Sequence, residues 1–419
     1  MNDSGLRVLL CPFGTLGEIQ PAIALGATLR QRGHDVRILA PAIYQRNAQA
    51  LGLDFVAVGS ADKFEAFMAQ RLLWHSALGY ELLARGVADM IEPGYAAVLS
   101  HQAEGRTVLV HSWMSVGARV ARDALNIPAV TLHPYPMIFR SRFDPAKTPP
   151  LPLRKGAPVW NDIWYGAVDL LMDHWLARPV NAFRGKLGLP PVRRIMRDWI
   201  HSPDRAIGLF PDWFAEPQAD WPAQARLTGF PLYDAGREEP LSAELLRFLD
   251  DGPPPIVFTS GGAVRHAGAF FRTAVEICRA SQRRGVLLAP FGTQLPDVPS
   301  FMHSAAYVPF SRLLPRSAVL VHHGGIGTIA QALAAGTPQV AVPVVFDHAD
   351  NSARMERLGV GHAIAPSRFN VRTGIAAIER VSSSAHEDAR NRVKASFSGA
   401  ADPLTQSAEL IEQAFRGAH

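Results

Sequence analysis

Cysteine is scarce in this chain, with only two among 419 residues. Cys11 and Cys278 lie far apart in apolar surroundings, which excludes a disulfide framework or a cysteine-based zinc cluster and is typical of a reducing compartment. A membrane span of roughly 18 apolar residues is absent, and the first residues lack the basic and apolar segments of a signal peptide. We therefore expect a cytoplasmic protein with two buried free thiols, and leave open a peripheral contact at the inner membrane.

Two common nucleotide-binding patterns are also missing. No Gly-x-x-x-x-Gly-Lys-Ser/Thr motif occurs, and the glycines at 14 and 17 do not keep the Gly-x-Gly-x-x-Gly spacing of dinucleotide folds. The formal charge of +5 comes from scattered basic residues, without a basic tract interleaved with aromatics. This charge suits a small anionic ligand or a membrane surface and gives no reason to expect nucleic acid.

The length and the 48% hydrophobic content predict two α/β domains. Each half begins with a buried strand, a glycine turn, a helix and another buried strand, a βαβ rhythm that indicates a parallel sheet covered by helices. A linker rich in Pro and Gly between residues 230 and 255 separates the halves. We predict an N-terminal domain at 1–235, a C-terminal domain at 236–400, and a helix in 401–419 that packs back on the first domain.

Hydrophobic periodicity predicts the individual elements. The expected strands are 6–12, 36–40, 107–110, 129–132, 256–259, 286–289, 319–321 and 339–343, and the expected helices are 21–32, 116–125, 267–279 and 329–335. The proline-rich segment 145–158 predicts a long surface loop. Residues 64–95 have helical periodicity, which we interpret as a pair of core helices, with a membrane-binding helix as the alternative.

The segment 322–328, His-His-Gly-Gly-Ile-Gly-Thr, joins a predicted strand to a predicted helix. Glycines let the backbone turn sharply, and the first amides of the new helix have no intrahelical partner, so they point toward an anion. The threonine hydroxyl and the two imidazoles add further hydrogen-bonding groups. We interpret this segment as a phosphate or diphosphate site; an ordinary strand-helix turn is the alternative.

This motif, followed by Ala-Ala-Gly-Thr-Pro-Gln at 334–339, Pro343, Asp347-His348 and Asn351, resembles the donor-binding signature of the GT-B glycosyltransferases of the UDP-glycosyltransferase-like family 1. The resemblance extends along the chain and implies two Rossmann-like domains that face each other across a cleft. The first would bind an acceptor and the second a nucleotide sugar. Within the family, segments 199–203 and 209–222 resemble the rhamnosyltransferase of bacterial rhamnolipid synthesis.

The resemblance also implies which residues bind the donor. The diphosphate would contact His322, Gly324, Gly325, Gly327 and Thr328, with Ser260 and Gly261 on the other side. Tyr307 stands where the family has a tryptophan that stacks on the base, and the backbone of Val308 would bind the base edge. Asp347 and His348 stand where an acidic residue and a glutamine usually bind sugar hydroxyls, so the histidine leaves the sugar unspecified.

The catalytic base of the family follows a glycine just after the first strand, and Glu18 occupies this position after Gly17. The partner region 111–113 carries no acid, which a histidine base would need and a carboxylate base does not. The alternative is that Glu18 is a helix-start residue favoured by the helix dipole. For the acceptor, Trp74, Trp113, Met114 and His133 are candidates to line an apolar cleft.

Taken together, the resemblance implies an inverting, metal-independent glycosyltransferase. It would move a sugar from a nucleotide sugar of the dTDP-rhamnose or UDP-glucose type to a hydroxyl of a lipophilic acceptor, such as a hydroxy fatty acid lipid. No cofactor or metal is expected, because the helix end and histidine would offset the charge of the leaving diphosphate. The alternatives are a polyketide, sterol or other natural-product aglycone as acceptor, a nonhydrolysing sugar-nucleotide epimerase, or an inactive nucleotide-binding partner. The sequence does not predict an oligomeric state.

Overall fold

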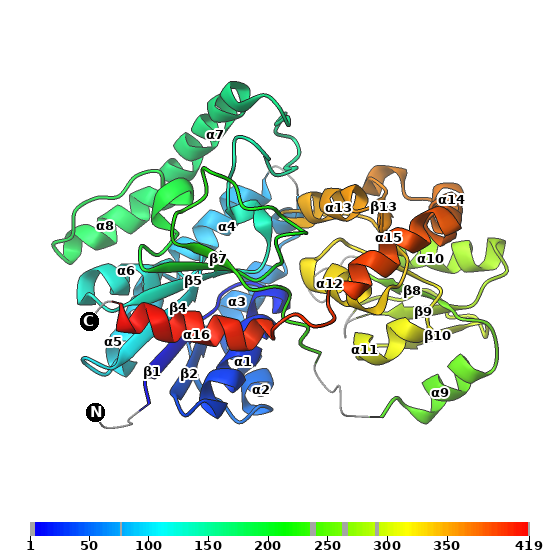
Figure 1. The fold of residues 1–419 in the computed structure, drawn as a ribbon, viewed down its shortest axis with the longest axis horizontal. Helices are drawn as coiled ribbons and strands as arrows, with labels where there is room; N and C mark the ends of the chain where they lie inside the picture. The colour runs from blue at the N-terminus through cyan, green and yellow to red at the C-terminus, as the bar shows by residue number, and fades with distance from the viewer. Residues whose placement is uncertain (1–4, 76–77, 235–239, 262–266, 290–292, 418–419) are drawn as a thin grey trace. The chain divides into compact units, whose positions relative to one another are not determined.

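The computed structural model describes residues 5–75, 78–234, 240–261, 267–289 and 293–417 (Figure 1). The chain forms two compact units: unit 1 is Met1–Pro231 together with Ala401–His419, and unit 2 is Leu232–Ala400. The boundary predicted between residues 235 and 236 lies outside the described residues. Each unit is a parallel sheet with helices on its faces, so the expected α/β class with two Rossmann-like sheets is confirmed.

Unit 1 is built on seven parallel strands in the order β3-β2-β1-β4-β5-β6-β7. Central strand β1 pairs Arg7 with Asp35 on one side and with Thr107 on the other. The strands are β1 Arg7–Cys11, β2 Asp35–Ala40, β3 Asp54–Ala57, β4 Thr107–Ser112, β5 Ala129–His133, β6 Arg205–Gly208 and β7 Ala225–Leu227.

Helices of unit 1 cover both faces of this sheet (Figure 1). They are α1 Leu16–Gln31, α2 Gln45–Gln49, α3 Ala61–Met68, α4 Gly79–Ala88, α5 Ile91–His101, α6 Val116–Leu125, α7 Pro158–Met172, α8 Arg178–Lys186 and α16 Pro403–Arg416. Short 3-10 segments occur at Ala42–Tyr44, Arg71–Trp74 and Pro136–Ile138, and π-helical turns at Asp173–Ala177 and Ile195–Trp199.

Unit 2 has six parallel strands in the order β10-β9-β8-β11-β12-β13. The strands are β8 Ile256–Thr259, β9 Gly285–Leu288, β10 Met302–Ala305, β11 Val319–His322, β12 Gln339–Ala341 and β13 Gly361–Ala363. The helices are α9 Ala243–Asp250, α10 Gly268–Ala280, α11 Phe310–Leu313, α12 Ile326–Ala335, α13 His348–Arg357, α14 Val371–Ser382 and α15 Ser384–Ala395, with 3-10 segments at Leu314–Arg316 and Pro366–Arg368.

The central strands explain why the periodicity is readable in the sequence. Val8, Leu9 and Leu10 of β1 are fully buried, as are Val319 to Val321 of β11, because helices cover both faces of each sheet. Cys11 and Cys278 are buried free thiols, as expected, and burial raises the pKa of both to about 12. Within the described residues, no helix combines the length and the apolar character needed to cross a bilayer.

Two predicted segments differ from the structure. Helix α1 begins at Leu16 rather than at residue 21, because Thr15 and Glu18 form a capping box that starts the helix before the proline. Residues 64–95 are not one helix pair: they contain part of α3, the 3-10 segment, all of α4 and the start of α5. Their inward residues, such as Phe64, Val87 and Ile91, are buried in the unit, which supports the core interpretation.

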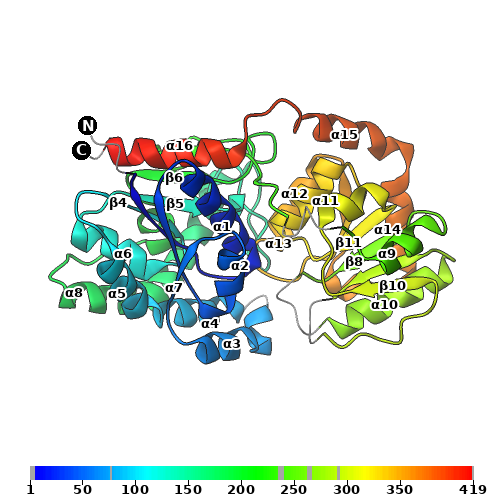
Figure 2. The same cartoon turned by 90° about the horizontal axis from the view of Figure 1, so that it is seen from below.

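Helix α16 packs on unit 1, against α1 and strands β4 to β6 (Figure 2). Thr228 and Ser407 share a hydrogen bond of 3.0 Å at this contact. Glu412 accepts two hydrogen bonds from Arg32, at 2.7 and 2.9 Å, and a third from His34 Nε2 at 3.0 Å. The Arg32 hydrogen bonds lower the pKa of Glu412 to about 2. A charged, bidentate contact therefore fixes the C-terminal helix to the first unit.

We expect Glu412→Gln to lower the free energy of unfolding of unit 1 by about 1–2 kcal/mol at pH 7, because the charged acceptor is lost. Thermal unfolding followed by circular dichroism measures this change. Glu65→Gln, an exposed substitution on α3 of the same unit, is the matched control and should have no effect. Since the folded pKa of Glu412 is depressed, the difference between wild type and Glu412→Gln should persist above pH 4.5 and shrink below it. Equal stability of the two variants at pH 7 would contradict the assignment.

Candidate functional site

Each of the two sheets has its own topological switch point. In unit 2, the strands run outward from β8 in one direction and from β11 in the other, and in unit 1 the same divergence occurs between β1 and β4. Open α/β sheets bind ligands at the carboxyl ends of the strands at such a point, where the two loops separate. The predicted donor motif follows β11 and the predicted base follows β1, so each lies at the switch point of its own unit.

The glycine loop after β11 can only be built with glycine at one position. Gly324 has φ +91°, and a Cβ atom there would lie 2.7 Å from Ser352 Oγ and 3.0 Å from the His348 carbonyl oxygen. Helix α12 then starts after Gly325, which has no side chain to cap it. The first amides of α12 therefore lack a side-chain partner, in contrast to the capped starts of α1, α3 and α14.

Gly327 and Thr328 lie in this uncapped first turn. Gly327 is exposed, and a Cβ atom built on it would meet no atom of the protein within 4 Å. Thr328 follows Gly327 in the same turn and is half-buried. A glycine inside a helix costs stability, so an open position at Gly327 is consistent with a ligand that approaches the backbone closely.

His322 ends β11 and is fully buried. Its Nδ1 accepts a hydrogen bond of 3.1 Å from the Gly324 amide, so the proton of a neutral ring lies on Nε2. Nε2 makes no hydrogen bond of good geometry within the described residues, but the buried Gln339 side chain lies close enough to raise the pKa of the ring. Burial lowers the pKa of His322 to about 3. In the free protein His322 is therefore neutral and offers an N–H donor, and its role beside a leaving diphosphate stays a prediction.

His323 occupies a more central place than its neighbour. A Cβ atom on Gly261 would lie 2.5 Å from the His323 ring, and one on Gly325 would also overlap it. The ring thus fills the space between the end of β8 and the start of α12, and its centroid lies 4.8 Å from that of His348. Burial lowers the pKa of His323 to about 4. The residue set implied by the resemblance omitted His323, and the only sequence signal for it was the doubled histidine.

Ser260 lies on the β8 side of the same point. It is buried, and within the described part of the chain its Oγ has no hydrogen-bond partner. Gly261 follows with φ +80° and donates its amide to Thr259 Oγ1 at 3.2 Å. An unsatisfied buried hydroxyl is costly, so this position suits a group that arrives with a ligand.

The acidic residue predicted to bind the sugar is tied to the glycine loop. Asn351 Nδ2 donates to Asp347 Oδ2 at 2.5 Å and to the Gly324 carbonyl at 3.3 Å. Phe346, just before, has φ +52°, an uncommon conformation for a phenylalanine. Nδ1 of His348 accepts from the Val345 amide at 3.4 Å, and burial keeps the pKa of this imidazole well below its usual value.

Tyr307 is 54% exposed, and its hydroxyl donates to Asp234 Oδ1 at 2.9 Å. Asp234 also accepts from the Ser311 amide at 2.7 Å, so the carboxylate fixes the phenol to the start of α11. Val308 is buried in the core beside it. A fixed, exposed ring is suited to stacking on a planar base, the role implied for Tyr307 by the resemblance.

At the switch point of unit 1, Glu18 performs the helix-start role that was the alternative to catalysis. Its Oε2 accepts from the Thr15 amide at 2.9 Å and from Thr15 Oγ1 at 2.8 Å. Its Oε1 faces the Tyr135 hydroxyl at 3.4 Å, and the Trp113 indole donates to that hydroxyl at 3.0 Å. An indole N–H can only donate, so the Tyr135 proton is available for Glu18. One carboxylate oxygen caps the helix and the other is held by a tyrosine.

Two effects compete in setting the pKa of Glu18. Burial raises it, whereas the hydrogen bonds from Thr15 and Tyr135 lower it, and the burial effect is larger. A carboxylate with a raised pKa is a stronger base than one in water.

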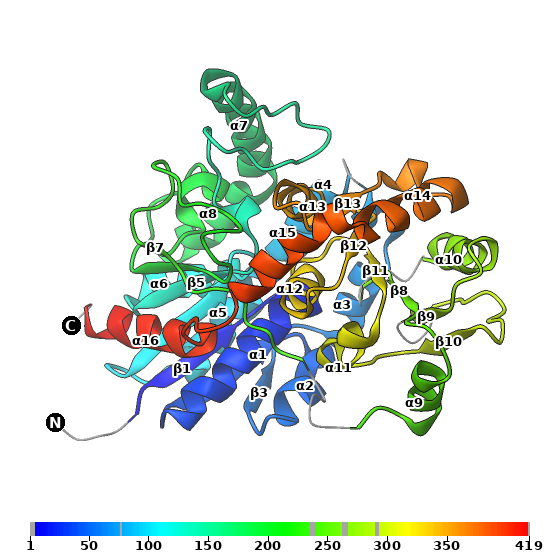
Figure 3. The ribbon, with the colours of Figure 1, turned by 45° about the vertical axis from the view of Figure 1, so that its right-hand side comes forward.

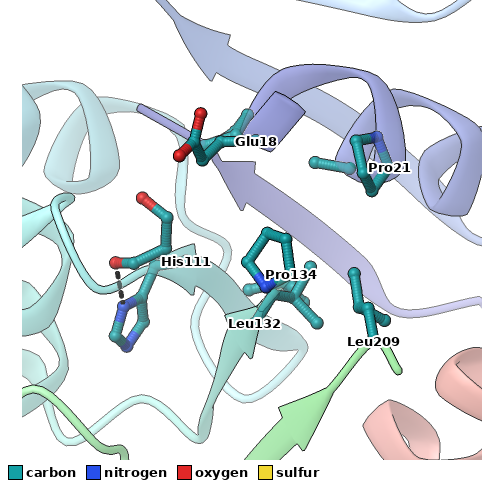
Figure 4. A pocket seen from close by; sticks show the side chains of 10 residues that line it. Glu18, Pro21, His111, Leu132, Pro134 and Leu209 are labelled. Carbon is teal, nitrogen blue, oxygen red and sulfur yellow. Dashed lines mark hydrogen bonds between the residues drawn. The ribbon is translucent and has the colours of Figure 1, made fainter. Parts of the chain in front are cut away.

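Glu18 also lines a small pocket, with room for about one water molecule. Figure 4 shows Glu18 of α1 and His111 of β4 around it, with Leu132, Pro134 and Leu209 below. The remaining lining residues are Pro12, Pro21, Ala22, Val110 and Ser112. His111 is buried, bonds through Nδ1 to the Ser112 carbonyl at 3.0 Å, and has its pKa lowered by burial to about 4. The pocket is therefore mostly apolar with one acid at its edge.

The predicted acceptor residues are not all brought together. Trp113 joins Glu18 through Tyr135, and Met114 lies against Gly14, where a Cβ atom would meet both Met114 Cε and Glu18 Oε2. His133 is fully buried and its Nε2 lies 3.0 Å from Nδ1 of His201. Trp74 belongs to a 3-10 segment and donates to the Met68 carbonyl at 3.3 Å. The acceptor roles of His133 and Trp74 stay predictions.

Known proteins with related sequences and folds identify the family. Residues 287–413 match the family described as erythromycin biosynthesis protein CIII-like, C-terminal domain. The chain is 30% identical over 392 residues to the O-mycaminosyltylonolide 6-deoxyallosyltransferase of Streptomyces fradiae, covering 90% of this chain and 89% of that enzyme. The chain belongs to the GT-B family 1 glycosyltransferases. It is therefore a hexosyltransferase, which sets aside the epimerase and the inactive partner.

Solved structures agree on the fold. The glycosyltransferase of kitacinnamycin superposes with a TM-score of 0.76 at 18% identity, over 98% of this chain and 99% of that one. A glycosyltransferase of Streptomyces sp. SF2575 complexed with thymidine diphosphate superposes with a TM-score of 0.63 at 19% identity, over 97% and 99%. The GT-B class predicted for this glycosyltransferase is thus confirmed, while the narrower resemblance to rhamnolipid enzymes stays a prediction.

Gly327→Ala gives opposite effects on stability and on binding. Alanine should stabilise helix α12 by up to about 1 kcal/mol, because glycine is a poor helix former. The same methyl group should weaken the affinity for dTDP and UDP in titration calorimetry, because it occupies space needed by the diphosphate. Gly166→Ala is the matched control: this glycine of α7 also has no atom within 4 Å of a built Cβ. Undiminished affinity in Gly327→Ala would remove Gly327 from the donor site.

Proposed function

We propose that this glycosyltransferase moves a deoxyhexose from a thymidine diphosphate sugar to a hydroxyl of a lipophilic natural-product aglycone, with inversion at the anomeric carbon. The observation that carries the proposal is the carboxylate of Glu18, which has a raised pKa and lies at the edge of an apolar pocket. A hydroxyl placed at that pocket would have a base beside it, and the apolar lining would contact the adjoining part of the acceptor.

The donor side of the proposal rests on unit 2. The uncapped amides of α12 are donors that suit diphosphate oxygens, and His322 lies beside them with its proton on Nε2. Tyr307 offers an exposed face for the base, and Asp347, tied to Asn351, offers carboxylate oxygens for sugar hydroxyls. The α12 amides and the His322 N–H are suited to stabilising the negative charge of the leaving diphosphate, so we assign no divalent metal to the reaction.

The chemical step then balances without a cofactor. Glu18 accepts the proton of the acceptor hydroxyl as its oxygen attacks the anomeric carbon. The bond between that carbon and the diphosphate oxygen breaks, and the electron pair leaves with the nucleoside diphosphate. Attack from the face opposite the leaving group inverts the anomeric centre. Glu18 afterwards loses its proton to solvent.

The substrate class follows the relatives. One relative is named for a 6-deoxyallosyl donor group and the acceptor O-mycaminosyltylonolide, and a structural neighbour is complexed with thymidine diphosphate. These names favour a natural-product aglycone over the hydroxy fatty acid lipid that the sequence first suggested. The assay therefore presents dTDP-rhamnose, UDP-glucose and UDP-GlcNAc to macrolide aglycones and to 3-hydroxy fatty acid dimers, with mass detection and with EDTA in a parallel reaction. Sugar transfer only to the fatty acid dimers would overturn the acceptor class.

Glu18→Gln separates the two roles of this residue. Glutamine still accepts from the Thr15 amide and so keeps the cap, but it cannot take a proton. We expect turnover to fall by about 100- to 10,000-fold, the range for a lost general base. Affinity for dTDP, measured by calorimetry, should stay unchanged because the donor groups are in unit 2. Near-normal turnover in this variant would show that Glu18 caps helix α1 and is not the base.

Tyr135→Phe tests the hydrogen bond that holds Oε1 of Glu18. This bond lowers the pKa of the carboxylate, so its loss raises the pKa further and more of Glu18 is protonated at a given pH. The acid limb of the kcat/KM profile should move to higher pH. Trp113→Phe, which removes the donor to Tyr135, is the comparison and should move the limb less. A uniform loss of rate at every pH would show that Tyr135 has a packing role only.

A further inference from the structure

Helix α7 turns apolar residues to solvent and polar residues to the protein, the reverse of a helix that packs on a core. Its large exposed residues are apolar: Val159 is 73% exposed, Ile163 62% and Leu170 76%. Its buried residues are Asn161, fully buried, Asp169, 8% exposed, and Met172, 7% exposed, so two of the three are polar. An apolar face turned to solvent on one helix is the reverse of the usual pattern and marks a surface that meets something else.

The polar side of α7 is committed to the protein. Asn161 Nδ2 donates to the carbonyls of Arg142 and Arg154, both at 2.8 Å, and its Oδ1 accepts from the Arg154 amide at 2.9 Å. Asp169 forms an ion pair with Arg140. Rotating the helix to bury its apolar side would break all these bonds. The exposed face is therefore fixed by the fold.

The exposed residues form one continuous stripe. Val159, Trp160, Ile163, Leu170 and Leu171 are all at least 40% exposed, and the positions between them on this face are Gly166 and Ala167, also exposed. Spacings of three and four residues place them on one side of the helix, along about 18 Å of its axis. Figures 1 and 3 show α7 at an edge of unit 1, away from the sheet. We call these residues the α7 stripe.

Positive charge gathers around the α7 stripe. Residues 140–200 contain eleven Lys and Arg against five Asp and Glu, an excess that exceeds the +5 of the whole chain. Lys155 and Arg178 are exposed just before and just after α7, and Arg193, Arg194 and Arg197 are exposed near its C-terminal end. The half-buried Asp162 of the helix pairs with Arg142 at 2.8 Å, and the exposed Asp198 pairs with Arg197 at 3.9 Å.

We propose that the α7 stripe binds the surface of an anionic lipid bilayer, with the helix lying in the plane of the headgroups. An apolar face with tryptophan, flanked by basic residues, has the chemistry of an interfacial helix. Trp160 suits this place, because its ring is apolar while its Nε1 already donates to the Pro152 carbonyl at 2.8 Å. The membrane-binding alternative from the sequence was assigned to residues 64–95, a different segment. The proposal does not depend on the sugar or the acceptor.

Flotation with vesicles of phosphatidylglycerol and phosphatidylcholine tests this proposal on the full chain. Wild type should float with vesicles that contain phosphatidylglycerol, and added salt should weaken the binding. Ile163→Ser with Leu170→Ser should weaken binding by about 100-fold. Lys155→Gln with Arg178→Gln should weaken it by about 30-fold. Thermal unfolding verifies that each variant is folded.

Matched controls change the same chemistry elsewhere. Leu72→Ser with Leu99→Ser replaces two exposed leucines outside α7, and Arg46→Gln with Lys63→Gln removes two exposed basic residues of other helices. Both control pairs should float like wild type. Wild type that stays unbound, or stripe variants that float like wild type, would overturn the proposal. Sedimentation equilibrium distinguishes a protein occupant: self-association that disappears in Ile163→Ser with Leu170→Ser would assign the stripe to a second copy and also overturn it.

Discussion

In each sheet, successive strands are added outward in opposite directions from a central strand pair, and both sites depend on this arrangement. Parallel strands that run outward from β8 and β11, or from β1 and β4, leave a gap above their carboxyl ends that no crossover helix covers. In unit 2, the His323 ring fills part of that gap and the uncapped start of α12 opens onto it. In unit 1, the capped start of α1 fixes a carboxylate there. One topology thus presents hydrogen-bond donors in one unit and a carboxylate in the other.

The treatment of charge differs between the two sites. Burial lowers the pKa of three histidines in unit 2, so these rings are neutral and present fixed dipoles rather than positive charges. Unit 1 buries a carboxylate against three hydrogen-bond donors, which compensate part of the cost of removing it from water. Neither site depends on an exposed charge. Salt should therefore screen electrostatic interactions less at these two sites than at the surface around α7.

The sequence predicted what is local and failed where packing decides. Helix α6 has the predicted bounds, because Ser115 and the left-handed Asn126 end a periodic segment at both sides. The short strands β3, β6, β7, β10 and β13 were missed, since three or four residues with partly exposed positions carry little periodicity. The donor motif was readable because glycine turns have a chemical reason in the chain itself. The place of His323 and the Trp113–Tyr135–Glu18 connection depend on contacts between residues up to 117 positions apart, which no local pattern encodes.

Helix α16 gives the chain an unusual order of assembly. Unit 2 is complete in sequence at residue 400, whereas unit 1 needs residues 403–416, with Glu412 against Arg32, to finish its surface. During synthesis, which releases the N-terminal end first, the second unit can therefore close before the first one is whole. Helix α16 can therefore pack on α1, the helix that carries Glu18, only after the segments of both units have been synthesised.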